Sequence, residues 1–413
     1  MPSAKKAIEI LLIALIGVAL FSNCGGNDES KGDANGDQSG DTTGVTDTQV
    51  LFGTHLPMSG NAAAAYAPVA SGLRAYFDYI NDVEGGVYGR KIKLIVGDDH
   101  YNPPDTLEVT RKQVEQDKVF GIVMGLGDET HSAVWKYLEE KGIPDMFIAS
   151  GLRKWTEPPV QTRFTGIPDY QIEGQMLGAY VAKNYDGKKV GVLRENNEYG
   201  EDGLIGLKKG LEGSSVEIVA DEKCEATIAD TSAQTQRLRS AGAEVVVSVA
   251  GPLMSASLVQ TARSVMTWDV PILVSGVDCS DIFIDLAGAE NAEGVVSVVF
   301  GHQVYETDVP GVKQHHEIMA KYGGGALVSN FTLYGASIGE MTVEVLKRTG
   351  PNLTRESFVK AAESIRDWVC STCVAPVNMS PTDHRPQEIE MYNRVEGGKW
   401  VAFGDPVDFE TTR

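Results

Sequence analysis

Few side chains in this sequence are spaced as reactive or metal-binding groups usually are. Asp98 and Asp99 are adjacent acids, but neighbours in an extended segment point to opposite faces, so they are poor candidates for a coupled acid and base. Their place after a strand-like segment favours a role in a turn. The 7 histidines are scattered without metal-ligand spacing. We expect His315 and His316 to lie on an exposed helix face.

Cys370 and Cys373 form a CxxC motif, a spacing that serves metal sites, redox sites or local disulfides. A zinc site would need a second CxxC or a nearby pair of histidines, and the sequence has neither. The N-terminus, described below, indicates an oxidising compartment, where disulfides persist. We therefore predict a structural disulfide. Cys224 and Cys279 are expected to be small buried residues.

The sequence lacks the metal-binding and nucleotide-binding motifs of several enzyme classes. No HExxH motif or P-loop occurs. Gly125 and Gly127 are closely spaced, but the third glycine of a dinucleotide-binding fingerprint does not follow them. We therefore predict a protein that is not an enzyme and that has no cofactor and no metal.

The first residues are typical of an export signal. Lys5 and Lys6 form a basic region, and the apolar run Ile10 to Phe21 is too short to span a bilayer comfortably as a mature helix. The segment Leu20 to Cys24 resembles the lipobox of bacterial lipoproteins, in which the cysteine is lipidated and becomes the new N-terminus. We expect residues 1–24 to be a lipoprotein signal peptide. The alternative is an ordinary cleaved signal, with Cys24 an incidental thiol.

The segment after this cysteine is rich in Gly, Asp, Ser, Thr and Asn. Such a composition cannot bury enough surface to offset the entropy of ordering, so residues 25–48 should form a flexible tether. As a coil it would reach about 25–30 Å, which suits a domain held near a membrane protein. The formal net charge of −21 argues against nucleic acid or anionic lipid as a partner.

The rest of the chain reads as a two-lobed α/β protein. About 365 residues exceed the usual size of one hydrophobic core. Strand-length apolar runs alternate with helix-period segments from 49 to 148, and the rhythm restarts from 170 to 275. This pattern predicts two lobes, each a doubly wound parallel sheet. Three later helices, near 312–321, 331–347 and 355–365, have no sheet of their own and must pack onto the lobes, as must two strands near 388–395 and 399–402.

We expect the first lobe to comprise residues 50–166 and about 301–384, and the second residues 167–300 and about 385–405. Such a division makes the chain cross between the lobes several times, which forms a hinge. Ligands of open parallel sheets bind at the carboxyl ends of the strands, at a topological switch point. The sequence therefore predicts a cleft that closes on a ligand, an arrangement called a Venus flytrap.

Short motifs follow one another in a distinctive order. They are Leu56-Pro57-Met58-Ser59-Gly60, Ile80-Asn81, Gly85-Gly86, Gly89-Arg90-Lys91-Ile92, Asp98-Asp99-His100-Tyr101-Asn102-Pro103, Glu198-Tyr199-Gly200 and Ser380-Pro381-Thr382-Asp383-His384-Arg385-Pro386. This set resembles the type I periplasmic binding proteins of the leucine/isoleucine/valine-binding class, over essentially all of Val50 to Asp405. The resemblance implies a receptor that captures an amino acid, or a similar polar solute such as an amide, amine or polyol, and hands it to an ABC permease.

The resemblance also implies where the ligand is held. In amino-acid-binding members, main-chain N–H groups and hydroxyls after the third strand hold the ligand carboxylate, as unpaired amides at a helix start can do. Across several loops, the resemblance implies ligand contacts at Ser59, Gly127, Asp128, Glu129, Thr130, Ser150, Gly151 and Leu152 in the first lobe, and at Tyr199, Gly251 and Asp278 in the second. Trp155 either stacks on the ligand or packs under the loop that leads to Pro158.

Asp128 and Glu129 depart from the family pattern, because members that bind aliphatic amino acids tend to carry small hydroxyl residues there. A carboxylate at this point would occupy the amides that a ligand carboxylate needs, or repel it. One interpretation is that Asp128 caps the following helix, which leaves Thr130 and main-chain groups for the ligand. The other is a neutral or cationic ligand without a free carboxylate. The next loop offers Leu152 and Arg153 instead of an ammonium-binding threonine, so plain branched-chain specificity is not expected.

Two functions are compatible with these features. The first is the extracytoplasmic binding component of an ABC importer, in the periplasm or at the cell surface and tethered to the membrane by lipid. The alternative is a ligand sensor that signals to a separate membrane protein, since the same fold serves signalling partners.

Overall fold

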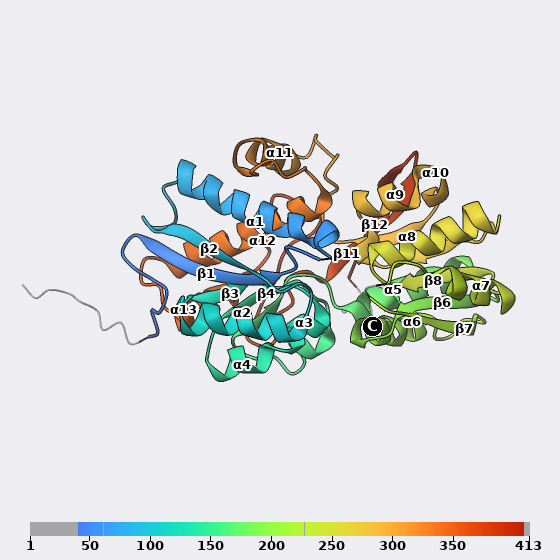
Figure 1. Ribbon diagram of the computed structural model, residues 1–413, viewed down its shortest axis with the longest axis horizontal. Helices are drawn as coiled ribbons and strands as arrows, with labels where there is room; N and C mark the ends of the chain where they lie inside the picture. The colour runs from blue at the N-terminus through green and yellow to red at the C-terminus, as the bar shows by residue number, and fades with distance from the viewer. Residues whose placement is uncertain (1–39, 61, 227, 409–413) are drawn as a thin grey trace, which may run out of the picture. The chain divides into compact units, whose positions relative to one another are not determined.

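The computed structural model describes residues 40–60, 62–226 and 228–408 (Figure 1). The predicted signal peptide, Cys24 and residues 25–39 of the predicted tether lie outside this range. No helix within it is both long enough and apolar enough to cross a membrane.

Residues 40–48, which the composition assigned to the flexible tether, are instead packed against the first lobe. Arg355 explains this difference. Its guanidinium forms an ion pair with Asp41 at 2.5 Å, and it also donates to the Phe120 carbonyl at 2.8 Å. The Leu51 N–H donates to the Gly44 carbonyl at 2.9 Å. Polar composition alone did not reveal these long-range partners.

The first lobe contains a parallel sheet of five strands in the order β2-β1-β3-β4-β5. Its strands are β1 (Gln49–Leu56), β2 (Lys91–Asp98), β3 (Gly121–Val123), β4 (Asp145–Ile148) and β5 (Arg163–Thr165). Phe52, Phe77, Phe120 and Phe358 are fully buried against one another and form the centre of its core. Because β1 and β3 are neighbours while β2 lies on the far side of β1, the order reverses beside β1.

Helices from two distant parts of the chain belong to this lobe. The early ones are α1 (Ala63–Val83), α2 (Pro103–Glu115), α3 (Asp128–Ser132) and α4 (Trp135–Glu140). The late ones are α11 (Pro310–Tyr322), α12 (Asn330–Thr349) and α13 (Arg355–Ala362). Both α11 and α12 pack against α1 (Figure 1). Local signals set several boundaries: Asn102 caps α2 with Pro103 next to it, and Ser329 and Thr354 begin α12 and α13 with capping boxes.

The second lobe contains a sheet of seven strands in the order β12-β11-β10-β9-β8-β6-β7. Its strands are β6 (Lys189–Glu195), β7 (Glu217–Cys224), β8 (Val245–Val249), β9 (Ile272–Val274), β10 (Val296–Val299), β11 (Ile389–Glu396) and β12 (Lys399–Asp408). The first five run parallel, as predicted, although β10 was not anticipated. The last two are antiparallel, because β11 enters from the hinge and returns through the tight turn at Gly397 and Gly398.

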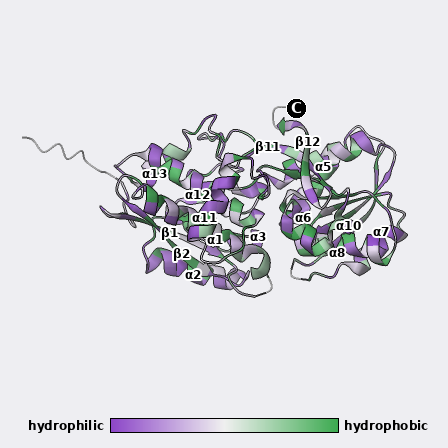
Figure 2. Ribbon diagram, turned by 90° about the horizontal axis from the view of Figure 1, so that it is seen from above, coloured by the Kyte–Doolittle hydropathy of each residue, from purple (hydrophilic) through white to green (hydrophobic). Residues whose placement is uncertain are grey.

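The helices of this lobe are α5 (Tyr170–Asn184), α6 (Glu198–Gly210), α7 (Ser232–Ser240), α8 (Pro252–Gln260), α9 (Asp281–Ala287) and α10 (Ala289–Ala292). A short helical turn occurs at Gly276–Asp278 and a π-helical turn at Thr261–Val265, and the first lobe has a short helical turn at Arg153–Trp155 between β4 and β5. Most helices show both hydrophobic and hydrophilic residues (Figure 2), as helices with one buried face do.

The chain connects the two sheets at residues 166–169, 300–309 and 363–388. The second and third connections are joined, since the His302 N–H donates to the Thr372 carbonyl at 2.8 Å. The third also meets the end of the first lobe, because His384 stacks on Phe164 with ring centroids 3.9 Å apart. Cys370 and Cys373 form a disulfide within the third connection. We propose these segments as the hinge and as the boundaries of the lobes.

Glycines allow α1 and α12 to approach closely. A Cβ atom added to Gly72 would lie 1.9 Å from the Thr332 carbonyl oxygen, and one added to Gly335 would lie 2.0 Å from that of Val69. Such distances leave no space for any side chain. The contact through which the late helices join the first lobe therefore depends on glycine at both positions.

We expect Gly72→Ala to lower the free energy of unfolding by about 1–3 kcal/mol, since the added methyl group must push α1 and α12 apart. This cost outweighs the higher helix propensity of alanine. Denaturant unfolding followed by circular dichroism measures the change. Arg74→Ala, at an exposed position of the same helix, is the control and should change stability by no more than about 0.5 kcal/mol. A Gly72 variant as stable as wild type would contradict this packing.

Candidate ligand-binding site

A cavity of about 160 Å³ lies between the two sheets. Its walls come from the carboxyl ends of strands in both lobes, namely Tyr101 after β2, Leu126 to Asp128 after β3, Ala149 after β4, Ile167 after β5, Glu195 at the end of β6, Gly251 after β8, Gly276 after β9 and Phe300 after β10. A cavity that holds a single water molecule has a volume of about 10–15 Å³. The cavity therefore has room for a small organic molecule.

Aromatic rings cover the first-lobe wall. Tyr66 from α1 stacks on Tyr101 with ring centroids 5.9 Å apart, and it meets Phe331 of α12 edge-on at 5.8 Å. Asp128, the first residue of α3, lies in the same wall and is 7% exposed. This wall offers a π surface beside one carboxyl group.

The second-lobe wall repeats this combination. Tyr170 of α5 and Tyr199 of α6 have ring centroids 4.4 Å apart. Glu195 accepts the Gly251 N–H at 3.0 Å, so the ends of β6 and β8 are joined at the point where the strand order reverses. Glu173 of α5 packs against Gly276, where an added Cβ would lie 2.7 Å from its Oε2.

Three buried acids therefore line the cavity. Burial raises the pKa of Asp128 to about 7, with the Ser150 hydrogen bond acting against the shift and the charge of Glu195 adding to it. Burial likewise raises the pKa of Glu173 to about 7 and raises that of Glu195. Among the described residues that line the cavity, none is Lys or Arg, and His302 is the one basic side chain.

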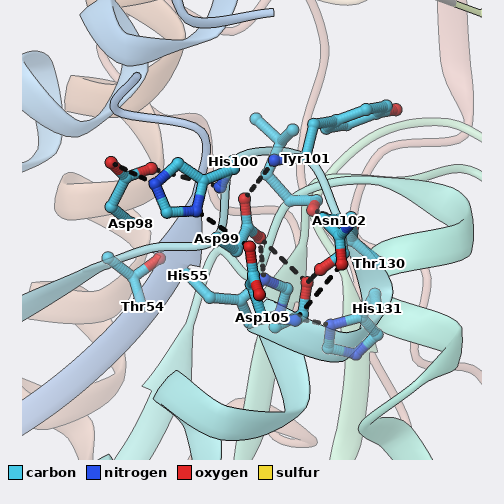
Figure 3. Close-up of polar contacts among 12 residues, drawn as sticks. Thr54, His55, Asp98, Asp99, His100, Tyr101, Asn102, Asp105, Thr130 and His131 are labelled. Carbon is cyan, nitrogen blue, oxygen red and sulfur yellow. Dashed lines mark hydrogen bonds and ion pairs between the residues drawn. The ribbon is translucent and has the colours of Figure 1, made fainter. Parts of the chain in front are cut away.

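A buried chain of four side chains includes His131 of α3, and Figure 3 shows its members Asp99, His55 and His131. His55, at the end of β1, contacts the Asp99 carboxylate at 3.0 Å and the His131 ring at 3.0 Å. His131 in turn contacts Asp145 at 2.8 Å. Each hydrogen bond needs a proton, and two neutral imidazoles carry two. All three bonds are made at once only when the four groups hold a third proton.

This chain fixes the loop that carries Asp128. Its four residues come from β1, the turn after β2, α3 and β4, so their contacts connect these elements. Glycine is required at position 125, next to this chain, because an added Cβ would lie 2.6 Å from His55 Nε2. Within the residues that the structure describes, no group of three or more His, Cys, Asp or Glu side chains is arranged to hold a metal ion. The network therefore acts as a polar support for the loop.

Comparison with known proteins identifies the family. A model of the family described as "Periplasmic binding protein" matches residues 49–394. The chain belongs to this family. Its members are solute-binding proteins rather than enzymes, and the fold expected from the sequence motifs is confirmed.

Three relatives illustrate the similarity. An "Amino acid binding protein" of Pseudomonas aeruginosa is 24% identical over 294 residues, 70% of this chain and 75% of the relative. A "Leu/Ile/Val-binding protein homolog 1" of Brucella abortus is 26% identical over 48% of this chain, and the match spans about half (53%) of that relative. A branched-chain amino acid ABC transporter structure from Thermus thermophilus with bound valine has a TM-score of 0.80 at 22% identity, covering 88% of this chain and 97% of that one.

Four of the site residues inferred from the resemblance line the cavity of this periplasmic binding protein: Gly127, Asp128, Tyr199 and Gly251. Three others are buried behind its wall. Ser150 donates to the Asp128 carboxylate, Thr130 donates to the Leu126 carbonyl at 2.6 Å, and Asp278 is fully buried with its pKa raised by burial.

The remaining inferred residues do not line the cavity. Ser59 is exposed and donates to Asp98 at 2.7 Å, and Glu129 points to solvent. Gly151 and Leu152 are buried in the adjacent loop, where a Cβ at Gly151 would lie 2.1 Å from the Pro168 carbonyl. Backbone packing accounts for the glycine at position 151.

The interpretation of Asp128 as a helix cap is wrong. Gly127 is the residue before α3, and Asp128 is its first residue, with its side chain bonded to Ser150. Trp155 takes the second of its two predicted roles, because it is fully buried and donates to Ser150 at 2.7 Å.

The expected exposed face at His315 and His316 is also wrong. His315 is 2% exposed and bonds Thr332 at 2.9 Å, and His316 bonds the Val304 carbonyl at 2.8 Å. Packing of α11 onto the first lobe covers this face. Asp98 and Asp99 do act separately, as predicted, since Asp98 serves the turn at Ser59 while Asp99 joins the histidine chain.

Sequence reasoning missed much of the cavity wall. Glu195 was available in principle, because it lies two residues after the strand expected at 189–193. Tyr66 and Phe331 carried no such signal, since they lie on helices far apart in sequence. Residues 335–339 match the GxSxG motif of hydrolases, which was also overlooked. They lie inside α12 rather than at a strand-to-helix turn, and Ser337 donates to the Tyr334 carbonyl at 2.8 Å.

The raised pKa of Asp128 predicts a pH-dependent cost to folding. Its unfolded pKa lies near 4, so between pH 4 and 7 the folded protein retains a proton that the unfolded chain has lost. The stability contributed by this group therefore falls as pH rises through that window. We expect Asp128→Asn to raise the melting temperature more at pH 8 than at pH 5, measured by differential scanning calorimetry. Glu129→Gln should show no such trend. A larger gain at pH 5 would contradict the assignment.

Proposed function

We propose that this protein is the extracytoplasmic binding component of an ABC importer and that it captures an amino acid or a similar small polar solute in the cavity. The observation that carries the proposal is the cavity itself. It lies at the carboxyl ends of the strands of both sheets, where ligands of such sheets bind. The family and the names of the relatives given above agree with this role.

The two walls suggest how capture proceeds. A ligand held first by the Tyr66 and Asp128 wall gains contacts with Tyr199 and Glu195 only when the second lobe approaches. Ligand binding therefore favours the closed form through contacts that the open form does not make. No covalent step is required of any side chain. The importer would dock on the closed form and reopen it.

Contacts between the lobes beside the cavity would hold the closed form. The Arg153 N–H donates to the Asp202 carboxylate at 3.1 Å. Lys154 forms an ion pair with Glu198 at the start of α6. Both partners of this pair are partly exposed, so its contribution is small, about 0–1 kcal/mol. Weak contacts between the lobes suit a protein that must reopen to release its ligand.

The location follows from the same assignment. A periplasmic binding protein works outside the cytoplasm, and the first residues carry the features of an export signal. We propose that Cys24 is lipidated and holds the mature protein at the membrane beside its permease. The residues between Cys24 and the packed segment at 40–48 would form the tether.

Ligand binding is tested by a thermal-shift screen of the full chain after refolding from denaturant to remove bound solute. The panel is amino acids, amides, amines and polyols. A ligand at 100 times its dissociation constant should stabilise the protein by about 2.7 kcal/mol, a shift of several degrees. No shift with any class would contradict the receptor function.

Two variants at Gly251 test whether a ligand identified by the screen binds in the cavity. A Cβ there would meet Met254, Glu195 and Tyr66 at 3.3–3.6 Å, so Gly251→Ala should nearly preserve binding. Gly251→Leu should abolish it, because the longer side chain fills the cavity. Equal binding by both variants would place the site elsewhere.

Lipidation is tested by Cys24→Ser expressed in a bacterium that processes lipoproteins. The wild-type chain should sediment with membranes and incorporate a labelled fatty acid, because the acyl chains anchor it. The variant should lose the label and be recovered in the soluble or precursor fraction. Unchanged labelling of the variant would exclude Cys24 as the modified residue.

A further inference from the structure

The charge of the cavity is unbalanced. Asp128, Glu173 and Glu195 line it from both lobes, each no more than 7% exposed. Asp278 lies directly behind the lining residues Val277 and Cys279 and is fully buried. Buried acids are normally paired with cations. Among the residues described by the structure, no lysine or arginine lines this cavity.

Two basic residues in the loop after β4, Arg153 and Lys154, serve other partners. Lys154 donates to Ser132 at 2.8 Å and pairs with Glu198, and Arg153 pairs with Asp169 at 3.0 Å. These interactions hold the rim of the cleft and the junction between the lobes. The one basic residue of the described lining, His302, contacts Glu306 at 3.0 Å, so a cationic ligand would offset the charge of these acids when they are ionised.

The aromatic rings fit the same kind of ligand. Tyr66, Tyr101 and Phe331 form one wall and Tyr170 and Tyr199 the other. Faces of aromatic rings attract ammonium groups, most strongly where water is excluded, and rings on several sides of a cavity are the usual arrangement for binding an alkylammonium.

Two polar atoms of the cavity wall lack a hydrogen-bond partner among the described residues. Gln387, in the hinge, is 6% exposed, and its Oε1 is buried without a partner. The hydroxyl of Tyr334, from α12, is also buried without one. Both residues line the cavity. The Gln387 oxygen accepts only, so it requires an N–H or O–H donor, which an ammonium group supplies.

We propose that the cavity binds a small organic cation, an amine or alkylammonium without a free carboxylate. The proposal rests on the receptor function above and names its ligand class. Asp128 and Glu195 would contact the ammonium group from opposite lobes, so a single cation would draw the lobes together. The tyrosines would surround its carbon skeleton.

An α-amino acid fits this cavity less well. Its carboxylate would lie beside three acids, with no lysine or arginine of the described lining to receive it. In the loop after β3, the Asp128 carboxyl group accepts from Ser150 and the Thr130 hydroxyl donates to the Leu126 carbonyl at 2.6 Å, so neither side chain is placed to receive a ligand carboxylate.

Four compounds with one carbon skeleton test the ligand charge directly: L-leucine, L-leucinamide, 3-methylbutan-1-amine and 3-methylbutan-1-ol. Choline and putrescine extend the set of cations. Isothermal titration of the refolded full chain should show at least one cation binding ten-fold or more tightly than leucine and the alcohol. Leucine or the alcohol binding as tightly as the best cation would overturn the proposal but leave the receptor function standing. Failure of every solute of the wider panel would overturn both.

Matched variants test the acids. Asp128→Asn and Glu195→Gln should each weaken cation binding ten-fold or more. Glu129→Gln, the exposed neighbour of Asp128, should leave it unchanged, and melting curves confirm that each variant is folded. Undiminished cation affinity in both cavity variants would overturn the proposal.

The pH dependence of the wild-type protein gives a test that needs no variant. Asp128 faces Glu195, Glu198, Lys154 and Ser150, and a bound cation favours its ionised form. Affinity for 3-methylbutan-1-amine, which stays protonated throughout, should rise several-fold from pH 6 to pH 8. A flat or falling profile would overturn the assignment of these carboxyl groups to the ligand.

Discussion

The structure depends on the way parallel strands end. All strands of the first sheet, and five of the second, direct their carboxyl ends towards the space between the lobes. The loops that follow cannot be covered by their own sheet, so their side chains and main-chain groups face the opposite lobe. The arrangement of the strands therefore also forms the site. Three connections joined through His302, Thr372 and His384 hold the two sets of loops opposite each other.

Placing carboxyl groups in this space has a cost that the rest of the molecule accommodates. Burial makes the ionised forms of Asp128, Glu173 and Glu195 unfavourable, which raises their pKa values. A buried hydrogen-bonded chain next to the loop keeps the Asp128 carboxyl group in its buried position. The chain from Asp99 through His55 and His131 to Asp145 fixes the loop that carries Asp128.

Much of the architecture was accessible from local patterns. The alternation of apolar runs with helical periods predicted two α/β lobes, and the motif order predicted the family. Local chemistry also placed several helix starts, such as Asn102 before Pro103. Errors arose where a distant partner overrides local composition. Residues 40–48 are polar yet packed, because Arg355 binds them, and His315 is buried because α11 lies against the first lobe.

The sequence by itself determined the class of protein, and it predicted strand-end loops that line the cavity, with an acid at position 128. These features follow from short-range spacing and from the rule that ligands bind at strand ends. Only the tertiary structure decided which loop residues face the cavity. Tyr66, Tyr101 and Phe331 meet there because α1, the turn after β2 and α12 pack together, whereas Glu129 is exposed. Which face of a short helix is buried depends on what packs against it, and those partners come from distant parts of the chain.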